Sequence, residues 1–441
     1  MARDKTGAGN LRLGACRDIA VTVKGREAPL EIHNMSAEVG PELTQAVILA
    51  GGLGTRLGEL TRDRPKPMIE FHGRPFLEYL VELLKEQGFA RILMLLGYKA
   101  EQIQGYFGDG ARHGVAISYS VSDVADDTGR RVKIAEPLCD PVFMLMYCDN
   151  YWPMDRLRMW ARFRARHPTL MVTVYRNADR YSRDNLRVGP DGFIEEYDKT
   201  RMAPNLQGVD IGFMICRREA LELLPARENV SFERTVFSEL VRRRALLAYL
   251  TEHRYYSVST PERLAAAEEF LARRPAVLLD RDGVLNRKPE KARYVRSPAE
   301  WQWMPGAIEA VATLKAAGFR VLVITNQAGI ARGEMTESDL AAIHAAMQRD
   351  LAAHGAAVDR IYYCPHGWDD GCECRKPKPG MLFQAQRDFN LDLSRTVFIG
   401  DDERDAQAGE AAGCPTVLIG PGRSLLDVVR SLVGKARAGG R

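Results

Sequence analysis

The stretch AVLLDRDGVLN, residues 276–286, decides the fold expected for the C-terminal part of this chain. Its first four residues form a short apolar run, which is typical of a strand buried on both faces of a parallel sheet. The run ends at Asp280 and Asp282. Two carboxylates at a strand tip are costly in a core but suit the carboxyl edge of an α/β sheet, where ligands bind. The stretch therefore predicts a site at the end of a buried strand.

This pair of carboxylates fits the chemistry of phosphoryl transfer. Asp280 could attack phosphorus and become an acyl phosphate. Asp282 could donate a proton to the leaving oxygen and take one from water. A divalent cation would let carboxylates and a phosphate share one site. The alternative interpretation of these residues alone is an acidic turn after a strand.

Polar residues follow two further apolar runs in the same part of the chain. Thr325 comes directly after VLVI, and its hydroxyl could bind a phosphate oxygen or cap a helix. Asp401, Asp402 and Asp405 follow TVFIG. We expect Asp401 to join Asp280 on the cation, whereas Asp405 is interpreted as part of an acidic helix start.

A DxDG turn, a Thr, a Lys and an Asp-rich turn, in this order, resemble the haloacid dehalogenase-like phosphatases. The Lys is Lys376, whose charge would hold the transferring phosphoryl group and balance the nucleophile. The resemblance implies the catalytic residues Asp280, Asp282, Thr325 and Lys376. It also implies a Mg²⁺ ion bound by Asp280, Asp282 and Asp401.

Three of the eight cysteines lie in one short loop with a histidine. The pattern Cys-x-His-x5-Cys-x-Cys offers four ligands, the set that a closed tetrahedral Zn²⁺ site requires: Cys364, His366, Cys372 and Cys374. A full ligand set leaves no position for water, so the zinc is expected to be structural. The glycines and aspartates between the ligands have little capacity to pack, and the metal would order the loop. Chance clustering of reduced thiols is the alternative.

The segments TNQAGIARG, CPH with CECRKPKPGM, and GDDERD resemble the D-glycero-D-manno-heptose 1,7-bisphosphate phosphatases, over about residues 275–420. The related histidinol-phosphate phosphatases share the zinc loop. Arg375 beside Lys376 favours the heptose enzymes, in which this arginine contacts substrate. The resemblance implies that Asn326, Gln327 and Arg375 bind substrate.

The N-terminal part shows a second strand, loop and helix pattern. The apolar run QAVILA leads into GGLGTRL, residues 51–57, and glycines after a strand let backbone N–H groups approach phosphates closely. Arg56 adds a fork-shaped phosphate ligand, and Lys66, between two prolines, is a rigidly presented cation. An amphipathic segment over residues 76–89 and the run RILMLLGY follow. This βαβ alternation predicts a mostly parallel sheet.

GGLGTRL followed by PKP resembles the sugar-1-phosphate nucleotidyltransferases, heptose- and mannose-1-phosphate guanylyltransferases among them, over about residues 45–273. The resemblance places a nucleoside triphosphate on Gly51, Gly52, Gly54, Thr55, Arg56, Lys66, Thr128 and Gly129. It places a Mg²⁺ ion on Asp149 and the sugar phosphate on Glu196, Lys199 and Asp210. In such a reaction a sugar phosphate oxygen attacks the α-phosphorus and pyrophosphate leaves.

One segment departs from this family. Its members usually carry Asp-x-Gly-Thr near the end of the domain, and that Asp is the second metal ligand. Here Ser257 stands in place of the Asp and Ser259 in place of the Gly. A neutral hydroxyl is a poor Mg²⁺ ligand beside a carboxylate. The transferase could therefore be slow, could use Asp210 instead, or could be inactive.

Length and composition indicate a globular chain of two or three domains. The 441 residues are 46% hydrophobic and 27% charged, with a formal net charge of +4, which gives no reason to expect a nucleic-acid partner. No long apolar run and no signal segment is visible, so a cytoplasmic enzyme without a membrane partner is expected.

We expect an α/β protein with two Rossmann-like three-layer domains. The first would have a mixed sheet, and the second a parallel sheet with the zinc loop. The expected parts are an N-terminal extension over residues 1–43, a transferase domain over 44–274, a phosphatase domain over 275–425 and a C-terminal helix and tail over 426–441.

The two resemblances together predict a bifunctional sugar-phosphate enzyme. It would hydrolyse the heptose bisphosphate to the 1-phosphate through an aspartyl phosphate, and it would transfer a nucleotide from GTP or ATP to a sugar 1-phosphate. Such a fusion puts consecutive steps toward a nucleotide-activated heptose on one chain. The alternative is a phosphatase for heptose bisphosphate or histidinol phosphate whose N-terminal domain only binds a nucleotide and regulates. A third hypothesis is that the phosphatase acts on a polynucleotide 3′ end. The near-neutral charge of the chain and the lack of aromatic-basic clusters disfavour it.

Overall fold

The structure, a computed structural model, describes residues 42–290 and 292–439. All but the last two residues of the expected N-terminal extension therefore lie outside the described part. No helix within the described ranges combines the length and the apolar composition that a membrane crossing requires.

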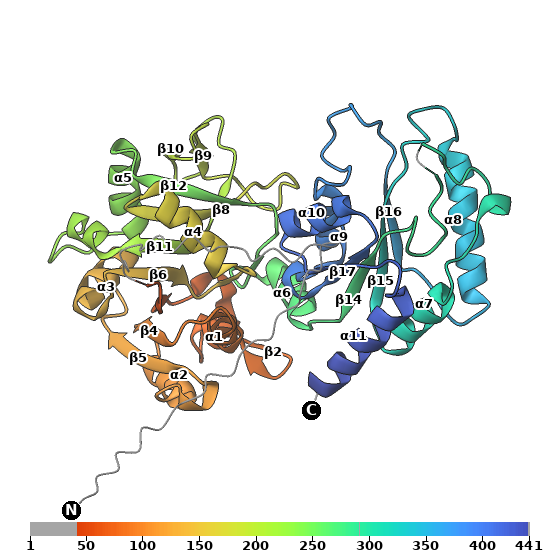
Figure 1. Cartoon of the computed structure of the whole chain (residues 1–441). Helices are drawn as coiled ribbons and strands as arrows, with labels where there is room; N and C mark the ends of the chain where they lie inside the picture. The colour runs from red at the N-terminus through yellow and green to blue at the C-terminus, as the bar shows by residue number, and fades with distance from the viewer. Residues whose placement is uncertain (1–41, 291, 440–441) are drawn as a thin grey trace, which may run out of the picture. The chain divides into compact units, whose positions relative to one another are not determined.

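The N-terminal part is built on a seven-stranded mixed sheet (Figure 1). Its order is β12 (Leu246–Thr251), β8 (Leu170–Tyr175), β11 (Val209–Arg217), β6 (Val142–Tyr147), β1 (Gln45–Ala50), β4 (Arg91–Leu96) and β5 (Ala116–Val121). β11 runs antiparallel to both of its neighbours, and the other pairs are parallel. The sheet is thus mixed, as expected from the sequence.

Helices cover both faces of this sheet. One face packs against α1 (Phe76–Glu86), α2 (Ala100–Phe107), α4 (Arg156–Arg166) and α6 (Pro261–Leu271). The other packs against α3 (Thr128–Ala135) and α5 (Ser238–Arg242). β1 shows why both faces are apolar: Ile48 belongs to the first core and Leu49 to the second, since successive side chains of a strand point to opposite faces.

Three short antiparallel strand pairs border this sheet. They are β2 (Glu70–Phe71) with β3 (Arg74–Pro75), β9 (Leu186–Val188) with β10 (Ile194–Tyr197), and β7 (Asn150–Tyr151) with β13 (Tyr256–Ser257). The last pair places Ser257 opposite Asn150. It therefore brings the end of the N-terminal part back to the carboxyl end of β6.

The C-terminal part is built on a five-stranded sheet in which every pair is parallel. Its order is β16 (Arg360–Cys364), β15 (Arg320–Asn326), β14 (Ala276–Leu279), β17 (Val397–Gly400) and β18 (Thr416–Leu418). α7 (Ala307–Ala316), α8 (Glu337–Ala352) and α11 (Leu425–Gly439) pack on one face. α9 (Gly380–Phe389) and α10 (Glu403–Ala412) pack on the other, which completes three layers (Figure 1).

The central strand β14 is the topological switch point of this sheet. From β14 the chain moves outward through β15 and β16 on one side, and then through β17 and β18 on the other. Open α/β sheets bind ligands outside the carboxyl ends of the strands at such a point. The fold thus places Asp280, Thr325 and Asp401 at one edge, and the expected α/β fold class is confirmed.

The expected C-terminal helix is present as α11 and packs against the second sheet. Leu425, Val428, Val429 and Val433 of α11 are buried in the same core as α7. The helix therefore belongs to the packed layer of the second sheet, because its apolar stripe is covered rather than exposed.

Candidate active sites

The first site lies at the carboxyl edge of the five-stranded sheet, where Asp280 follows β14. Asp280 Oδ1 lies 2.8 Å from Lys376 Nζ, and Asp405 Oδ1 lies 2.7 Å from the same nitrogen. Lys376 also donates to the carbonyl of Ile324 at 2.9 Å. All three charged side chains are buried. One ammonium group is thus shared between two buried carboxylates.

Burial governs protonation in this cluster. It raises the pKa of Asp280 to about 7, while Lys376 opposes the rise and the Asp405 carboxylate adds to it. Burial alone would lower the pKa of Lys376, but Asp280 and Asp405 raise that pKa above its ordinary value. Lys376 is therefore a permanent cation beside a carboxylate that loses its proton close to neutral pH. Such a pair at a dry strand end suits attack on a phosphoryl group.

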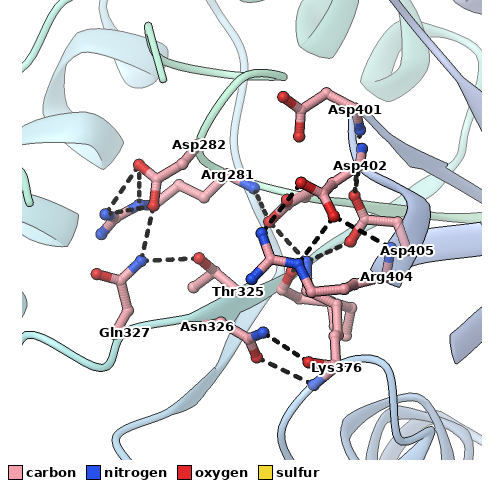
Figure 2. Close-up of polar contacts among 12 residues, drawn as sticks. Arg281, Asp282, Thr325, Asn326, Gln327, Lys376, Asp401, Asp402, Arg404 and Asp405 are labelled. Atoms are coloured by element: carbon pink, nitrogen blue, oxygen red, sulfur yellow. Dashed lines mark hydrogen bonds and ion pairs between the residues drawn. The ribbon is translucent and has the colours of Figure 1, made fainter. Parts of the chain in front are cut away.

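Asp282 turns away from this cluster. Its oxygens accept hydrogen bonds from Arg281 at 3.0 Å, from Asn286 at 2.8 Å and from Gln327 at 2.9 Å. Burial would raise the pKa of Asp282, but Arg281 and the two amides bring that pKa below its ordinary value. Figure 2 shows Asp282 beside Arg281 and Gln327, apart from Asp405. The resting structure therefore holds Asp282 ionised.

The carboxylates that can hold a metal differ from the expected set. Oxygens of Asp280, Asp401 and Asp405 lie within 4.8 Å of one another. The expected set contained Asp282 in place of Asp405; the Asp282 side chain lies apart from this group, and its part in metal binding stays a prediction. The reason is that Arg281 holds the Asp282 side chain elsewhere, whereas the first turn of α10 turns Asp405 into the site. Asp405 is thus more than the acidic helix start that its sequence position indicates.

Asp401 carries the observation that favours a cation. Its Oδ1 is buried without a hydrogen-bond partner, and burial raises the pKa of its carboxyl group. Its Oδ2 accepts from Lys288 at 2.8 Å. Gly283, at φ 96°, leaves the room for this carboxylate, because a Cβ there would lie 2.2 Å from Asp401 Oδ2. Carboxylate oxygens are ligands that Mg²⁺ takes, so these residues fit that ion.

The residues at the end of β15 take up different tasks. Thr325 and Asn326 line the cavity of the site. Asn326 also accepts from the Lys376 N–H at 3.1 Å and donates to the Lys376 carbonyl at 3.0 Å, which fixes the lysine backbone. Gln327 is buried outside the cavity lining and donates to Thr325 at 2.8 Å and to Asp282 at 2.9 Å. Its amide nitrogen is engaged with these two side chains, and the binding of substrate by Gln327 stays a prediction.

A cavity of about 520 Å³ opens over these groups. Arg375 lines it, and so do four residues that the sequence analysis missed: Lys288, Arg293, Trp368 and Arg404. They come from loops and a helix turn rather than from strand ends, so no strand-tip pattern marks them. Five cations and five carboxylates line this cavity. Among the described residues, Arg293 and Arg375 are the two lining cations that make no ion pair with a carboxylate, so they are available to a phosphorylated ligand.

The expected zinc ligands come together in the loop before α9. Cys364 Sγ lies 3.7 Å from Cys372 Sγ and 3.6 Å from His366 Nδ1. Cys374 Sγ lies 3.5 Å from Cys372 Sγ and 3.2 Å from His366 Nδ1. Four ligands at tetrahedral Zn–S lengths would stand about 3.7 Å apart. The cluster is therefore able to hold a metal ion, and its spacing fits zinc.

The second site lies at the carboxyl edge of the seven-stranded sheet. Asp149 follows β6, and its Oδ2 lies 2.7 Å from Lys66 Nζ. Burial would raise the pKa of Asp149, but Lys66 brings it below its ordinary value. Gly54, at φ 68°, packs against the lysine stem, since a Cβ there would lie 3.0 Å from Lys66 Cβ. The structure thus joins the Gly-rich loop and Asp149 through one ion pair.

A cavity of about 460 Å³, here called the sugar cavity, opens beside Asp149. Its wall contains a carboxylate that the sequence analysis missed. Glu233 accepts from Tyr147, from Ser231 at 2.6 Å and from Lys199 at 3.0 Å. Asp210 lines the same cavity. Burial raises the pKa of Asp210 to about 7, a backbone hydrogen bond opposes the rise, and Glu233 adds to it. These groups can bind the hydroxyls of a sugar.

Glu196 and Lys199, both expected to bind the sugar phosphate, lie differently: Lys199 lines the sugar cavity and Glu196 does not. Glu196 lies 3.5 Å from Arg187 and does not line the sugar cavity, whereas its neighbour Tyr197 does. Successive residues of a strand point to opposite sides, and β10 turns Tyr197 inward. The partner of Lys199 is Glu233, which lies 34 residues further along the chain.

Two glycines of the expected nucleotide site are required by packing. A Cβ on Gly51 would lie 2.5 Å from Arg131 Cζ, and a Cβ on Gly129 would lie 2.6 Å from the carbonyl of Val230. Arg131 is buried. A close approach of phosphate is therefore not needed to explain these two glycines, and their contact with a nucleotide stays a prediction.

The other residues of that expected site lie around the loop. Gly52, Thr55 and Arg56 are exposed, and Arg56 lines the sugar cavity. Thr128 begins α3, and its hydroxyl accepts from the Phe232 N–H at 2.9 Å. The exposed loop residues are therefore free to meet a ligand, whereas Thr128 is engaged within the domain.

Ser257 lies next to Asp149 but its hydroxyl is used elsewhere. The Val258 N–H donates to the Asp149 carbonyl at 2.9 Å, so the segment runs beside that residue. Ser257 is buried and donates to Ser259 at 2.8 Å. Among the described residues, no group of three potential metal ligands includes Asp149. Ser257 therefore supplies no carboxylate beside Asp149, and Asp210, which lines the same cavity, stays the predicted alternative ligand.

Comparisons with known proteins agree with this two-site organisation. Residues 45–183 match the family model of nucleotidyl transferases, and residues 217–413 match that of haloacid dehalogenase-like hydrolases. The chain therefore carries both kinds of enzyme domain.

The C-terminal part also resembles individual proteins. The chain is 46% identical to the D-glycero-beta-D-manno-heptose-1,7-bisphosphate 7-phosphatase of Bordetella bronchiseptica over 152 residues, which cover 34% of this chain and 84% of the relative. It is 45% identical to the Pseudomonas aeruginosa protein of the same name over 159 residues, which cover 36% of this chain and 88% of the relative. A crystal structure of a D,D-heptose 1,7-bisphosphate phosphatase from B. bronchiseptica, with magnesium and phosphate, is 40% identical, covers 36% of this chain and 99% of that chain, and has a TM-score of 0.35. Through the part that carries Asp280 and Lys376, the chain belongs to the D-glycero-beta-D-manno-heptose-1,7-bisphosphate 7-phosphatase family, and it joins this hydrolase domain to a nucleotidyl transferase domain.

Proposed function

We propose that residues 275–425 hydrolyse D-glycero-D-manno-heptose 1,7-bisphosphate to the 1-phosphate through a phosphorylated Asp280. The observation that carries the proposal is the buried Asp280–Lys376–Asp405 cluster at the carboxyl end of β14. Arg293 and Arg375, which line the cavity above it and make no ion pair with a described carboxylate, support a substrate with more than one phosphate. The names of the relatives support the heptose as its sugar.

We assign a residue to each step. A carboxylate oxygen of Asp280 attacks phosphorus, and the sugar oxygen leaves with a proton from Asp282. Lys376 and the Thr325 hydroxyl hold the phosphoryl oxygens. Water then attacks the phosphorus of the acyl phosphate, Asp282 takes the proton of that water, and phosphate leaves. Because Arg281 keeps Asp282 ionised at rest, the first step requires Asp282 to leave this arginine and take up a proton.

Two metal ions complete the domain in this proposal. Asp280, Asp401 and Asp405 would hold Mg²⁺, which supplies charge that lets carboxylates and phosphate approach each other. Cys364, His366, Cys372 and Cys374 would hold a structural Zn²⁺ that orders the loop before Arg375.

A substrate comparison tests the phosphatase. Phosphate release from the heptose bisphosphate is measured beside release from histidinol phosphate, with Mg²⁺ and with Asp280→Asn as the blank. We expect kcat/KM to be at least about 100-fold higher for the heptose ester, because a second phosphate meets additional cations in the cavity. Equal values for the two esters would contradict the heptose assignment, and undiminished release by Asp280→Asn would contradict the mechanism.

Residues 44–274 are proposed to transfer a nucleotide from GTP or ATP to a sugar 1-phosphate. The Lys66–Asp149 pair beside the sugar cavity supports this reaction, since a cation and a potential metal ligand meet at one end of that cavity. The assay is pyrophosphate release from each nucleotide with heptose 1-phosphate and Mg²⁺. We expect slow release by the natural chain and at least about 10-fold faster release by Ser257→Asp, which adds a second carboxylate next to Asp149.

A second candidate function follows from Ser257 itself. If neither the natural chain nor Ser257→Asp releases pyrophosphate with GTP or ATP, a nucleotide-binding regulatory domain is favoured. That domain would bind a nucleotide, measured by calorimetry, and would change the phosphatase rate.

A further inference from the structure

A second cavity of the N-terminal part, of about 790 Å³, adjoins the sugar cavity and is assigned no role above. Four arginines line it: Arg180, Arg183, Arg201 and Arg263. Only one carboxylate, that of Asp184, stands in the same wall. A concave surface with this charge raises the local concentration of anions.

The guanidinium groups of this cavity have no acidic partners. Among the residues that the structure describes, none of the four makes an ion pair with a carboxylate, whereas the neighbouring Arg254 pairs with Asp179. The cavity's own carboxylate, Asp184, accepts a hydrogen bond from Asn177 at 2.9 Å. Four like charges repel one another unless an anion balances them, so the cavity is suited to a ligand that brings negative charge.

Neutral acceptors hold two of these arginines in fixed positions. Arg201 donates to the Ser182 hydroxyl at 3.1 Å and to the Arg183 carbonyl at 2.7 Å. Arg263 donates to the Tyr255 hydroxyl at 3.0 Å, and its guanidinium lies 4.6 Å from the centre of the Tyr181 ring. These contacts leave donors free on both planar groups, in the fork geometry that binds phosphate.

The backbone around the cavity is unusual. Asn177, Arg180, Arg201 and Asn205 all have φ between 53° and 61°, a left-handed conformation that residues with side chains rarely adopt. All four line this one cavity. Such conformations persist where the surrounding structure requires them, and they gather at ligand clamps. Here they direct two loops around the arginines.

The two cavities are neighbours that share part of their lining. Ser182, Arg201 and Arg263 line both of them. Asp149 and Arg56 line the sugar cavity only. A sugar that carries one phosphate near Asp149 and another near Arg201 would therefore span both cavities.

We propose that the arginine-lined cavity is a second phosphate-binding subsite of the nucleotidyl transferase domain, and that it takes the far phosphate of a sugar bisphosphate. The proposal rests on the proposed function, which supplies such a bisphosphate as the substrate of the other domain. The N-terminal domain thus binds the bisphosphate more tightly than the sugar 1-phosphate, because each phosphate monoester carries between one and two negative charges near neutral pH. When the phosphatase domain removes the far phosphate, the sugar binds the N-terminal domain less tightly.

Calorimetry on the full chain tests this proposal. Asp280→Asn prevents turnover, and heptose 1,7-bisphosphate is titrated into it in the presence of Mg²⁺. We expect two bound molecules per chain, one in each domain. Adding Arg180→Gln and Arg183→Gln is expected to weaken one of the two by at least about 10-fold, since charge-assisted contacts to phosphate are lost. The matched control is Arg162→Gln with Arg164→Gln on the exposed side of α4, which removes the same charge and is expected to keep both.

Three outcomes would overturn the proposal. They are a single bound bisphosphate in the Asp280→Asn chain, two unchanged sites after the Arg180 and Arg183 substitutions, and equal weakening of heptose 1-phosphate binding by those substitutions. Inorganic phosphate is titrated as a further probe, and displacement of the bisphosphate at equal concentrations would also contradict the assignment. Failure of the proposed function is seen separately, as absence of phosphate release from the bisphosphate by the natural chain.

Discussion

Replacing Lys376 by methionine tests the charge arrangement on which the phosphatase site depends. The ammonium lies 2.8 Å from Asp280 and 2.7 Å from Asp405, and all three groups are buried. Methionine fills a similar volume but leaves two buried carboxylates without a cation. Removing one partner of a buried ion pair costs about 3–5 kcal/mol, and we expect a loss of this size in the free energy of unfolding at pH 8 without Mg²⁺.

The loss is expected to depend on pH in a definite direction. Burial already raises the pKa of Asp280, and without Lys376 the Asp405 carboxylate raises the pKa of Asp280 further. An acid whose folded pKa is raised destabilises the fold increasingly as pH rises above its unfolded pKa. The cost of Lys376→Met should therefore be smaller at pH 5, where the Asp280 carboxyl group holds its proton, than at pH 8.

A second substitution gives the sharper test. Asp405→Asn alone removes one partner of Lys376 and destabilises the chain. In the Lys376→Met chain the same change removes one of two repelling carboxylates, and we expect it to restore about 1–3 kcal/mol. Phosphate release is expected to stay at least about 100-fold below the natural rate in the Lys376→Met chain and in the double variant, because both lack the Lys376 cation.

The assay is urea unfolding followed by circular dichroism at pH 5 and pH 8. Lys378→Met is the matched control, since this lysine pairs with Glu373 at the surface and its loss should cost less than about 1 kcal/mol. The reasoning is refuted if Lys376→Met is as harmless as this control, or if Asp405→Asn destabilises the natural and the Lys376→Met chains equally.

Three further predictions concern other parts of the molecule. Asp210→Asn should stabilise the chain by about 1–3 kcal/mol at pH 8 and by less at pH 5, as measured by urea unfolding at both pH values. The reason is that the pKa of Asp210 is raised to about 7, so the cost of its charge to stability grows as pH rises toward that value. Cys364→Ser should lower the zinc content from one ion per chain, measured by atomic emission, and lower the thermal midpoint by several degrees, about 2–8 °C. Gly51→Ala should cost about 1–3 kcal/mol in urea unfolding, because its Cβ would meet Arg131, whereas Gly52→Ala, with open space around it, should cost less than about 0.5 kcal/mol.

The sequence by itself determined the strand tips and the local metal loop. Asp280, Thr325 and Asp401 each follow an apolar run, and parallel strands end at one edge of a sheet, so their meeting could be predicted. The four expected zinc ligands lie within one loop, where spacing along the chain limits distance in space. The α/β fold class followed from the same alternation of strands and helices.

Tertiary structure alone decided which polar groups share a site when they come from distant segments. Glu233 meets Tyr147 across 86 residues, and nothing in either segment indicates the other. Asp405 rather than Asp282 joins the carboxylate cluster, because a buried arginine holds one and a helix turn directs the other. The arginine-lined cavity arises from two loops and a helix that only the fold brings together. Local pattern fixes a residue's chemistry, whereas its partners depend on packing and on ion pairs between segments far apart in the chain.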